Sequence, residues 1–283
     1  MLWLFLSVCH YAFNNVLWKL FLKGEQPLHI ISRRAIFTVA FAFGAAWVTQ
    51  VNLIDFILHP NSIYVFIASL FGVLGLVLMV TFLKSGSLVQ MAFYSLLGTG
   101  IAACYTYLFR EESLTTKAIL GSALMSIGYL VFCFNDRHKA QKEKAVFKQH
   151  LLLIGMTLSF SVSLLIQWES LKIFPPLAII CTQESTVLIT TSLLAIFFNP
   201  AENSRNSESQ STLKMALMAV VVFAGIFAGT IGLKTADPFL ASVAGFAVPV
   251  LTVIFGRIVF RDRMDVLHWA SLVLMIAGGV CLI

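Results

Sequence analysis

Long apolar runs recur along the whole chain, and they constrain its fold more than any other feature. Each run has about 20 residues, the length of an α-helix that crosses the hydrocarbon core of a bilayer. The composition agrees, because 59% of the 283 residues are hydrophobic, only 11% are charged, and the mean hydropathy is +0.91. A soluble globular protein carries about a quarter charged residues. The sequence therefore predicts an all-α membrane protein with the lipid bilayer as its main surroundings.

Turn and loop residues between the apolar runs divide them into ten predicted helices. The first five span residues 2–22, 29–50, 62–83, 87–109 and 114–134, and the second five span 151–171, 176–198, 213–233, 238–260 and 264–283. The basic stretch 135–150 separates the groups and predicts two halves, residues 1–145 and 146–283. Ten spans leave no room for a sizeable soluble domain, so the function is predicted to lie within the bilayer.

The two halves resemble each other when residues 86–134 are laid on residues 237–283. Phe109-Arg110-Glu111 then falls on Phe260-Arg261-Asp262, at an offset of 151. Because each half has an odd number of helices, the second copy enters the membrane from the opposite side. Inverted repeats of this kind form a binding site near the midplane and expose it alternately to the two sides. The alternative is a chance recurrence, since helix ends commonly carry charge.

Four passages carry a resemblance to a known family. They are LWKLFLK in the first helix, Arg33-Arg34 in the second, SLLGTGIAACYTYLFREESLTTKAILGSALMSIGYLVF, and AVPVLTVIFGRIVFRDRMDVLHWASLVLMIAGGVCL. In order and layout they resemble the EamA-type members of the drug/metabolite transporter superfamily, over essentially the whole chain. The resemblance implies a ten-helix transporter of organic solutes, often an exporter of amino acids or related metabolites. One departure is Phe260-Arg261-Asp262-Arg263, where the family usually has Gly-Glu.

Glu184 is the strongest candidate for a functional ionisable group. It lies about 12 Å along the predicted helix 176–198, at 1.5 Å per residue. An ionisable side chain at that depth costs about 2.5–3.5 kcal/mol on insertion scales, so it is retained mainly where it faces a partner or a water-filled cavity. We predict that Glu184 holds a substrate amine or takes up a coupling proton. The alternative is a hydrogen-bonded Glu that only holds helices together.

Polar stripes on the first and fourth helices complete the predicted binding site. Such stripes avoid lipid, and their amides and hydroxyls suit either a solute or a neighbouring helix. The predicted substrate-binding residues are Tyr11, Asn14, Asn15, Trp18, Gln90, Tyr94, Trp168, Gln183 and Glu184. The first and fourth helices are expected to meet the sixth and ninth around one cavity, with Asn14, Asn15, Gln90 and Tyr94 facing Glu184 or Trp168.

Gating is predicted from matched helix ends and from one proline. Trp18-Lys19 and Trp168-Glu169 occupy equivalent positions at an offset of 150, with opposite charges. They suit a gate, but long side chains near helix ends also reach water, which is the favoured interpretation. Arg33-Arg34 is placed near an interface in the same way, with recognition of an anionic solute as the alternative. Pro249 is predicted to kink its helix and expose a carbonyl.

Cofactors, metals and nucleic acids are not predicted as partners. The sequence has no P-loop, G-x-G-x-x-G, H-E-x-x-H or nucleophile elbow, which argues against ATP-driven transport by this chain alone and against a known hydrolase design. The formal charge of +6 is typical of a membrane protein with basic cytoplasmic loops. When sides alternate from the N-terminus, one side receives only Arg110, Lys117, Lys172 and Lys234.

The charge distribution predicts a cytoplasmic stretch 135–150 and both termini outside, in an inner or plasma membrane. The family resemblance implies the opposite orientation. The predicted function is secondary transport of a small organic solute, such as an amino acid, an amine or a related metabolite, facilitative or coupled to a proton or other ion gradient. Alternatives are a flippase of lipid-linked substrates and a membrane-embedded enzyme or scaffold.

Overall fold

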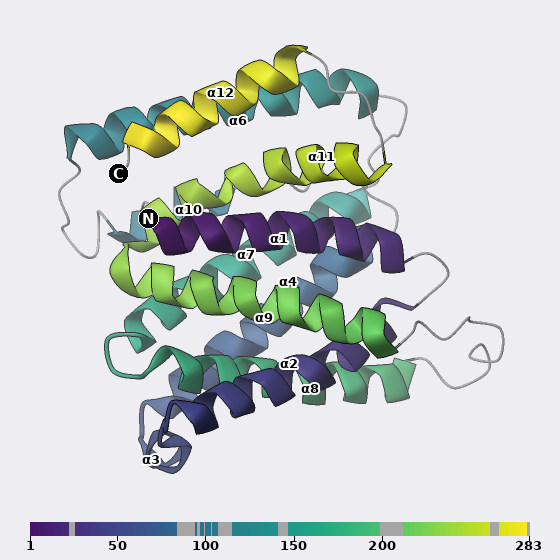
Figure 1. Cartoon of the computed structure of the whole chain (residues 1–283), viewed down its shortest axis with the longest axis vertical. Helices are drawn as coiled ribbons and strands as arrows, with labels where there is room; N and C mark the ends of the chain where they lie inside the picture. Colours follow the sequence, from purple (N-terminus) through teal and green to yellow (C-terminus); the bar gives the residue numbers. More distant parts are fainter. Residues whose placement is uncertain are drawn as a thin grey trace.

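The computed structural model describes residues 1–22, 26–83, 94, 97–98, 100–102, 104–106, 115–140, 147–198, 212–260 and 266–281, which form helices and no strands. The long helices run side by side (Figure 1). Their bounds, with those of the short helices, are α1 Leu2–Phe21, α2 Pro27–Val48, α3 Leu53–Leu58, α4 Ser62–Leu83, α6 Thr116–Ala140, α7 Phe147–Ser170, α8 Pro176–Phe198, α9 Thr212–Thr235, α10 Pro238–Gly245, α11 Ala247–Phe260 and α12 Val266–Cys281. The all-α prediction is confirmed for these residues.

Within the described part of the chain, six helical stretches are long and apolar enough to cross a bilayer. They are Pro27–Val48, Ser62–Leu83, Gln149–Ser170, Pro176–Phe197, Thr212–Thr235 and Pro238–Gly256. Two shorter apolar helices, Ile119–Val131 and Trp269–Gly278, lie in α6 and α12. The chain is therefore an integral, multi-pass membrane protein. Most of the predicted fourth helix, 87–109, lies outside the described residues.

Helices from the two halves pack against each other throughout the bundle. In the first half, α4 packs against α7 and α8 of the second half, and α1 packs against α9 and α11. In addition, α2 packs against α8 and α9, and α6 lies along α12 at one side of the bundle (Figure 1). The halves are therefore not separate globules, because the core of each is completed by the other.

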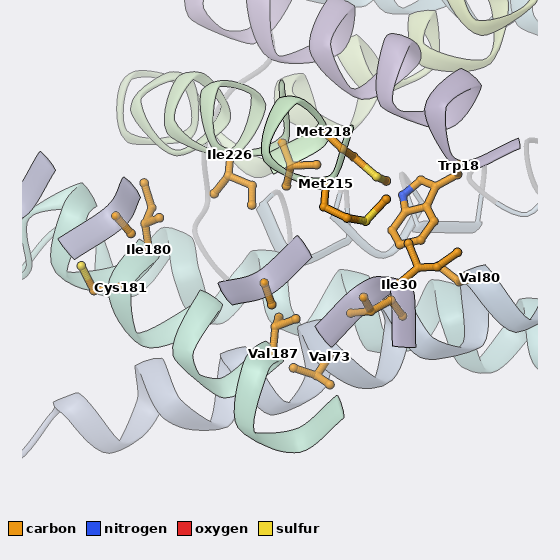
Figure 2. Packing of buried hydrophobic residues seen from close by; sticks show 14 of the residues in the cluster. Trp18, Ile30, Val73, Val80, Ile180, Cys181, Val187, Met215, Met218 and Ile226 are labelled. Atoms are coloured by element: carbon orange, nitrogen blue, oxygen red, sulfur yellow. The ribbon is translucent and has the colours of Figure 1, made fainter. Parts of the chain in front are cut away.

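The largest apolar cluster lies where α1, α2, α4, α8 and α9 converge (Figure 2). Trp18 is its largest member, and its indole is fully buried beside Met215 and Met218 of α9. Ile30 of α2 and Val80 of α4 approach the same ring (Figure 2). Trp18, a predicted substrate residue, thus packs between helices, and its indole Nε1 has no hydrogen-bond partner among the described residues.

The predicted polar loop 135–150 is shorter than expected. The apolar pattern stops at Phe134, but α6 continues to Ala140, and α7 already begins at Phe147. Asp, Arg, His and Lys are all tolerated in a helix once it has left the hydrocarbon, because the backbone hydrogen bonds do not need apolar side chains. Hydropathy therefore marks the end of the membrane span and not the end of the helix.

The predicted single helix 238–260 is interrupted. The structure has two helices, α10 and α11, with Phe246 between them. Pro249 has no N–H to donate to the carbonyl of Gly245, and a proline ring crowds the carbonyl four residues before it. The interruption falls next to that carbonyl, three residues before the proline.

One short helix was not predicted from the sequence. It is α3, which was assigned to the loop between the predicted helices 29–50 and 62–83. The side-chain oxygen of Asn52 accepts hydrogen bonds from the backbone N–H groups of Ile54 and Asp55, at 3.1 and 3.2 Å. This N-cap satisfies the first backbone donors of the helix, which explains why so short a segment becomes helical.

Candidate functional site

A buried ion pair joins α2 to α8. Arg34 Nη2 lies 3.4 Å from Glu184 Oε2, and the Thr38 hydroxyl donates a hydrogen bond to the same oxygen at 2.5 Å. Arg34 and Glu184 are 3% and 1% exposed, and Thr38 is also buried. Because Arg34 and Thr38 are four residues apart, they share one face of α2. Arg34, Thr38 and Glu184 are referred to below as the charge cluster.

The charge cluster lies well inside the apolar parts of its helices. Arg34 is about 10 Å along α2 from Pro27, and Glu184 is about 12 Å along α8 from Pro176, at 1.5 Å per residue. Arg34, which was expected near an interface together with Arg33, is buried against α8. Its neighbour Arg33 is exposed, whereas Arg34 faces α8 because consecutive side chains on a helix point about 100° apart.

The Arg34 guanidinium has an unused hydrogen-bond donor. Nε is buried and makes no hydrogen bond within the described residues. A guanidinium has five N–H donors in a planar fork, and the hydrogen bond to Glu184 uses Nη2. A buried donor without an acceptor costs about 1–3 kcal/mol. The guanidinium can therefore donate a further hydrogen bond, for example to an oxygen of a ligand.

Tyr11 of α1 borders the charge cluster. It interacts electrostatically with both Glu184 and Arg34. In contrast to these two residues, Tyr11 keeps 37% of its surface exposed. A Cβ added at Gly229 of α9 would lie 2.7 Å from Ser7 Oγ and 3.9 Å from Tyr11 Cε2, so this glycine permits the close approach of α9 to α1. Tyr11 is therefore a predicted site residue near both charges of the cluster, with part of its side chain at the surface of the bundle.

The two asparagines of α1 behave differently from each other. Asn15 Nδ2 donates to Thr252 Oγ1 of α11 at 3.3 Å, so Asn15 links two helices. Asn14 is buried, and its Oδ1 has no hydrogen-bond partner among the described residues. Asn14 Oδ1 can therefore accept a hydrogen bond from a solute or from a water molecule. Neither side chain is paired with Glu184.

Gln183 belongs to a second polar network, which connects α8 to α7 and α4. Gln167 Nε2 donates to Gln183 Oε1 at 3.4 Å and to Ser163 Oγ at 3.1 Å. Ser163 in turn donates to the backbone carbonyl of Ala68 at 2.8 Å. Adjacent residues of α8 thus serve different neighbours, Gln183 facing α7 and Glu184 facing α2. The sequence analysis did not single out Gln167 or Ser163.

A cavity of about 740 Å³ lies where α7 ends and α8 begins. Trp168 and Lys172 line it from α7 and the turn after it, Lys234 lines it from the end of α9, and Asp237 lines it from the N-cap of α10. The Lys172 ammonium stands 3.8 Å from the centre of the Trp168 ring, in cation–π geometry. The predicted substrate residue Trp168 thus lies at a cavity, but this cavity contains no member of the charge cluster.

Glu169 beside this cavity contacts a tyrosine and a lysine. Its Oε1 accepts a hydrogen bond from the Tyr105 hydroxyl at 2.9 Å, and its Oε2 lies 3.0 Å from Lys172 Nζ. The side chain of Lys19, which was matched with Glu169 as a gate, lies outside the described residues. The Lys172 side chain is about half exposed, and that of Glu169 is about one third exposed.

The predicted stripe on the fourth helix is only partly described. Gln90 lies outside the described residues. The Tyr94 hydroxyl forms a hydrogen bond of 2.6 Å with His150 Nδ1, at the start of α7. The backbone carbonyl of Tyr94 also accepts from Thr157 Oγ1 of α7, at 3.4 Å. The structure thus brings Tyr94 to α7 and does not pair it with Glu184.

The pairing of Arg34 with Glu184 was not predicted from the sequence, although the sequence contains a signal for it. The offset of 150 that lays Trp18 on Trp168 also lays Arg34 on Glu184. Thr38 gave no comparable signal, because an intramembrane threonine usually bonds a carbonyl of its own helix. Thr38 does bond the carbonyl of Ala35 at 3.1 Å, but it reaches Glu184 as well.

Comparison with known proteins identifies the family. The sequence matches the EamA-like transporter family over residues 1–134 and 147–283, which together are nearly the whole chain. The chain belongs to the EamA-like transporter family. This confirms the resemblance found in the sequence, and it makes this EamA-like protein a membrane transporter of the drug/metabolite transporter type.

A solved structure shares the fold of this EamA-like protein. It is titled "Crystal structure of protein", and it superimposes with a TM-score of 0.77 at 17% sequence identity. The alignment covers 99% of this chain and 95% of that chain. At this identity the likeness concerns the fold alone. A search of curated proteins found no match.

Proposed function

We propose that this EamA-like protein is a secondary transporter, an exporter or exchanger, of a small organic solute such as an amino acid, an amine or a related metabolite. The observation that carries the proposal is the charge cluster of Arg34, Thr38 and Glu184. Ionisable groups inside membrane helices are rare, and they mark solute or ion pathways much more often than they mark lipid-facing surface. Tyr11 gives the cluster an accessible neighbour, and the orphan acceptor of Asn14 offers a further polar contact.

The proposed architecture is a pair of inverted five-helix repeats with ten spans, residues 1–145 and 146–283. Glycine contacts between the long helices support it. A Cβ added at Gly75 would lie 2.7 Å from the Phe160 ring, and one added at Gly225 would lie 3.0 Å from His10 Cβ. Adding 150 to Gly75 gives Gly225, and adding 150 to His10 gives Phe160. The same contact therefore occurs twice, with the two halves exchanging roles.

The pair of α6 and α12 supports the repeats independently. A Cβ added at Gly128 would lie 2.8 Å from Met275 Cγ, and one added at Gly278 would lie 2.6 Å from Met125 Cγ. These four positions are again related by an offset of 150. Reciprocal contacts of this kind are what a two-fold axis generates between equivalent surfaces. The offset they favour is one residue smaller than the 151 suggested by the charged helix ends.

In the proposed mechanism, the two repeats rock about the bound solute and expose it alternately to the two sides. Glu184 holds a substrate amine or takes up a coupling proton, with Tyr11 and Asn14 beside it. The cavity at Trp168 is an access route, and Glu169 is part of the gate at that end. The break between α10 and α11 at Phe246 gives the moving helix a joint without a complete set of backbone hydrogen bonds.

A flippase for lipid-linked substrates is less favoured by the same cluster. A phosphate group requires an excess of positive charge in the site. The charge cluster has one guanidinium and one carboxylate, so its net charge is zero when both are ionised. A small solute that carries few charges fits it better than a phosphorylated lipid.

Counterflow in proteoliposomes tests the proposed function. A thermal-shift screen of metabolites first selects ligands, because a compound that binds only the folded state raises the apparent stability. Preloaded vesicles with wild-type protein are expected to exchange a selected labelled solute. The Glu184→Gln variant is expected to stay folded but to lose exchange or its pH dependence, because the amide keeps the shape and removes the titratable proton.

The matched control is Asp55→Asn, a carboxylate-to-amide change in α3, outside the long helices. It is expected to exchange as the wild type does. Absence of exchange across a broad metabolite panel would argue for a scaffold or enzyme instead. Wild-type exchange by Glu184→Gln at every pH would show that the carboxylate only holds helices together.

A further inference from the structure

The charge balance of the cluster restricts what can bind there. Arg34 and Glu184 neutralise each other in this structure, and both are almost completely buried. An isolated charge in a medium of low dielectric constant is very unfavourable, so the cluster has to remain neutral in every step. A solute amine bound to Glu184 would leave Arg34 without a counter-charge. A solute carboxylate bound to Arg34 would leave Glu184 unpaired, but a carboxylate can become neutral by taking up a proton.

We propose that Arg34 recognises a carboxylate group of the transported solute, which takes the place of Glu184 on the guanidinium while Glu184 takes up one proton. This inference rests on the proposed transport function and names the chemical class of its solute. No covalent bond to carbon forms or breaks. One proton moves from water to the Glu184 carboxylate, Arg34 stays protonated, and the net charge of the occupied site equals that of the empty one.

The geometry permits both parts of this exchange, the binding of a carboxylate by Arg34 and the protonation of Glu184. The unused Nε donor of Arg34 lies on the same fork as Nη2, and a carboxylate can bind such a fork through two oxygens. Glu184 reaches the guanidinium at 3.4 Å, which is longer than the 2.7–2.9 Å typical of a charge-assisted hydrogen bond. The Thr38 hydroxyl both donates and accepts. It bonds the ionised Glu184 now and can accept the O–H of the protonated form.

Few other titratable groups face Glu184 to compete for the proton. Arg34 of α2 and Tyr11 of α1 interact with it, and Cys181 is the other titratable residue on α8 itself. The other titratable or charged residues of α1 and α2 are Cys9, His10, Lys19, His29 and Arg33. His10 Nδ1 forms a hydrogen bond with the carbonyl of Leu6 at 2.7 Å. The helices α4, α7 and α9 carry titratable side chains only near their ends, at Tyr64, Lys148, His150, Glu169, Lys214 and Lys234. Within the described residues, Glu184 is therefore the acid at mid-depth that can exchange its proton when Arg34 changes partner.

Matched acids and amides test the inference on the purified full-length protein. The probes are lactate with lactamide and isovalerate with isovaleramide, acids and amides without an amine, and the readouts are ligand-induced thermal stabilisation and proton uptake in weakly buffered solution. We expect the two acids to stabilise the wild type and to cause uptake of one proton per bound ligand. The amides are expected to do neither, because they lack the negative charge that replaces Glu184.

Variants at Arg34 and at its neighbour make the test specific. Arg34→Lys keeps the charge but not the fork, so acid binding is expected to weaken about tenfold or more. Arg33→Lys, the same change at an exposed position, is expected to bind like the wild type. Arg34→Gln alone leaves the Glu184 carboxylate buried without a counter-charge, so the double variant Arg34→Gln/Glu184→Gln is used as well. It is expected to fold and to lose both the preference for acids and the proton uptake.

The outcomes separate this inference from the proposed function. Stabilisation by acids and amides alike, stabilisation by neither, or an acid preference that survives in the double variant would overturn the role of Arg34. If counterflow nevertheless succeeds with uncharged solutes, transport stands and the carboxylate exchange is wrong. If no solute is exchanged at all, the proposed function fails together with it.

Discussion

Arg34 of α2 and Glu184 of α8 are 150 residues apart in the sequence and form a buried ion pair, with Nη2 and Oε2 separated by 3.4 Å. The same offset relates the glycine contacts between α4 and α7 to those between α9 and α1. In the proposed repeats, the two residues therefore occupy equivalent positions, one half supplying the base and the other the acid. Any relative movement of the halves then acts directly on this pair.

The first prediction concerns the energetics of the pair. Removing one partner leaves a buried charge uncompensated, which typically costs about 3–5 kcal/mol. Arg34→Gln and Glu184→Gln are each expected to destabilise the protein, and the double variant is expected to be more stable than the sum of the two effects. A coupling energy on the order of 1–3 kcal/mol is expected from unfolding in mixed micelles. Additive effects would show that the two charges do not interact.

The second prediction separates a structural role of the pair from a functional one. Exchanging the charges in Arg34→Glu/Glu184→Arg keeps an acid opposite a base, so the variant is expected to retain most of the stability that each single substitution loses. Transport is expected to be lost, because the donor fork and the titratable acid then lie on the wrong helices. Thermal unfolding and counterflow on the same preparation check both parts. Full transport by the variant with exchanged charges would show that Arg34 and Glu184 have only a structural role.

The third prediction concerns the close packing of α6 on α12. An alanine at Gly278 would place its Cβ 2.7 Å from the backbone nitrogen of Met125, and one at Gly128 would place it 2.9 Å from the backbone oxygen of Ser271. Backbone atoms cannot move aside locally, so both substitutions are expected to destabilise the protein by about 1–3 kcal/mol.

The control for these glycines is Gly44→Ala in α2. Nothing lies within 4 Å of its added Cβ, so alanine is expected to be neutral or to stabilise the helix by up to about 1 kcal/mol. Denaturation midpoints of the three variants give the comparison. Equal stability for all three would mean that α6 and α12 do not approach as closely as described.

The fourth prediction concerns the break between α10 and α11. Pro249→Ala supplies the missing N–H and removes the ring, so α10 and α11 are expected to become one continuous helix. The protein is expected to fold, bind ligand and exchange it more slowly, because the joint at Phe246 has stiffened. Pro238→Ala is the control, since Pro238 occupies the first turn of α10, where no intrahelical donor is needed. Unchanged counterflow in Pro249→Ala would show that transport does not depend on a flexible joint at Phe246.

The fifth prediction concerns access to the site. In a cysteine-free background, cysteines at positions 11, 14, 90 and 94 are expected to react with small water-soluble thiol reagents, and bound solute is expected to slow the reaction. Cysteines at Ile36 and Leu120, which are exposed on the apolar surfaces of α2 and α6, are expected to stay inert in lipid. Tyr11→Cys is the decisive position. If it reacts no faster than the lipid-facing pair, the proposed route to the charge cluster does not exist.

Much of the fold was open to prediction from the sequence, because the bilayer imposes one simple rule. Every spanning backbone has to satisfy its own hydrogen bonds, so each apolar run of sufficient length becomes a helix. Glu184 stood out for a related reason, since an acid in the middle of such a run needs a partner. Pro249 likewise predicted an interruption of its helix, because a proline lacks the backbone N–H that a helix needs.

The partners of these residues were decided by the tertiary structure. Helical periodicity shows which side chains share a face, but it does not show which other helix covers that face. Asn15 was expected in the solute site and instead bonds Thr252 of α11, and Trp18 is enclosed by the methionines of α9. Arg34 looked like an interfacial residue until its helix was placed against α8. The physical reason is that pairing between helices depends on contacts 150 or more residues apart, which only packing in three dimensions selects.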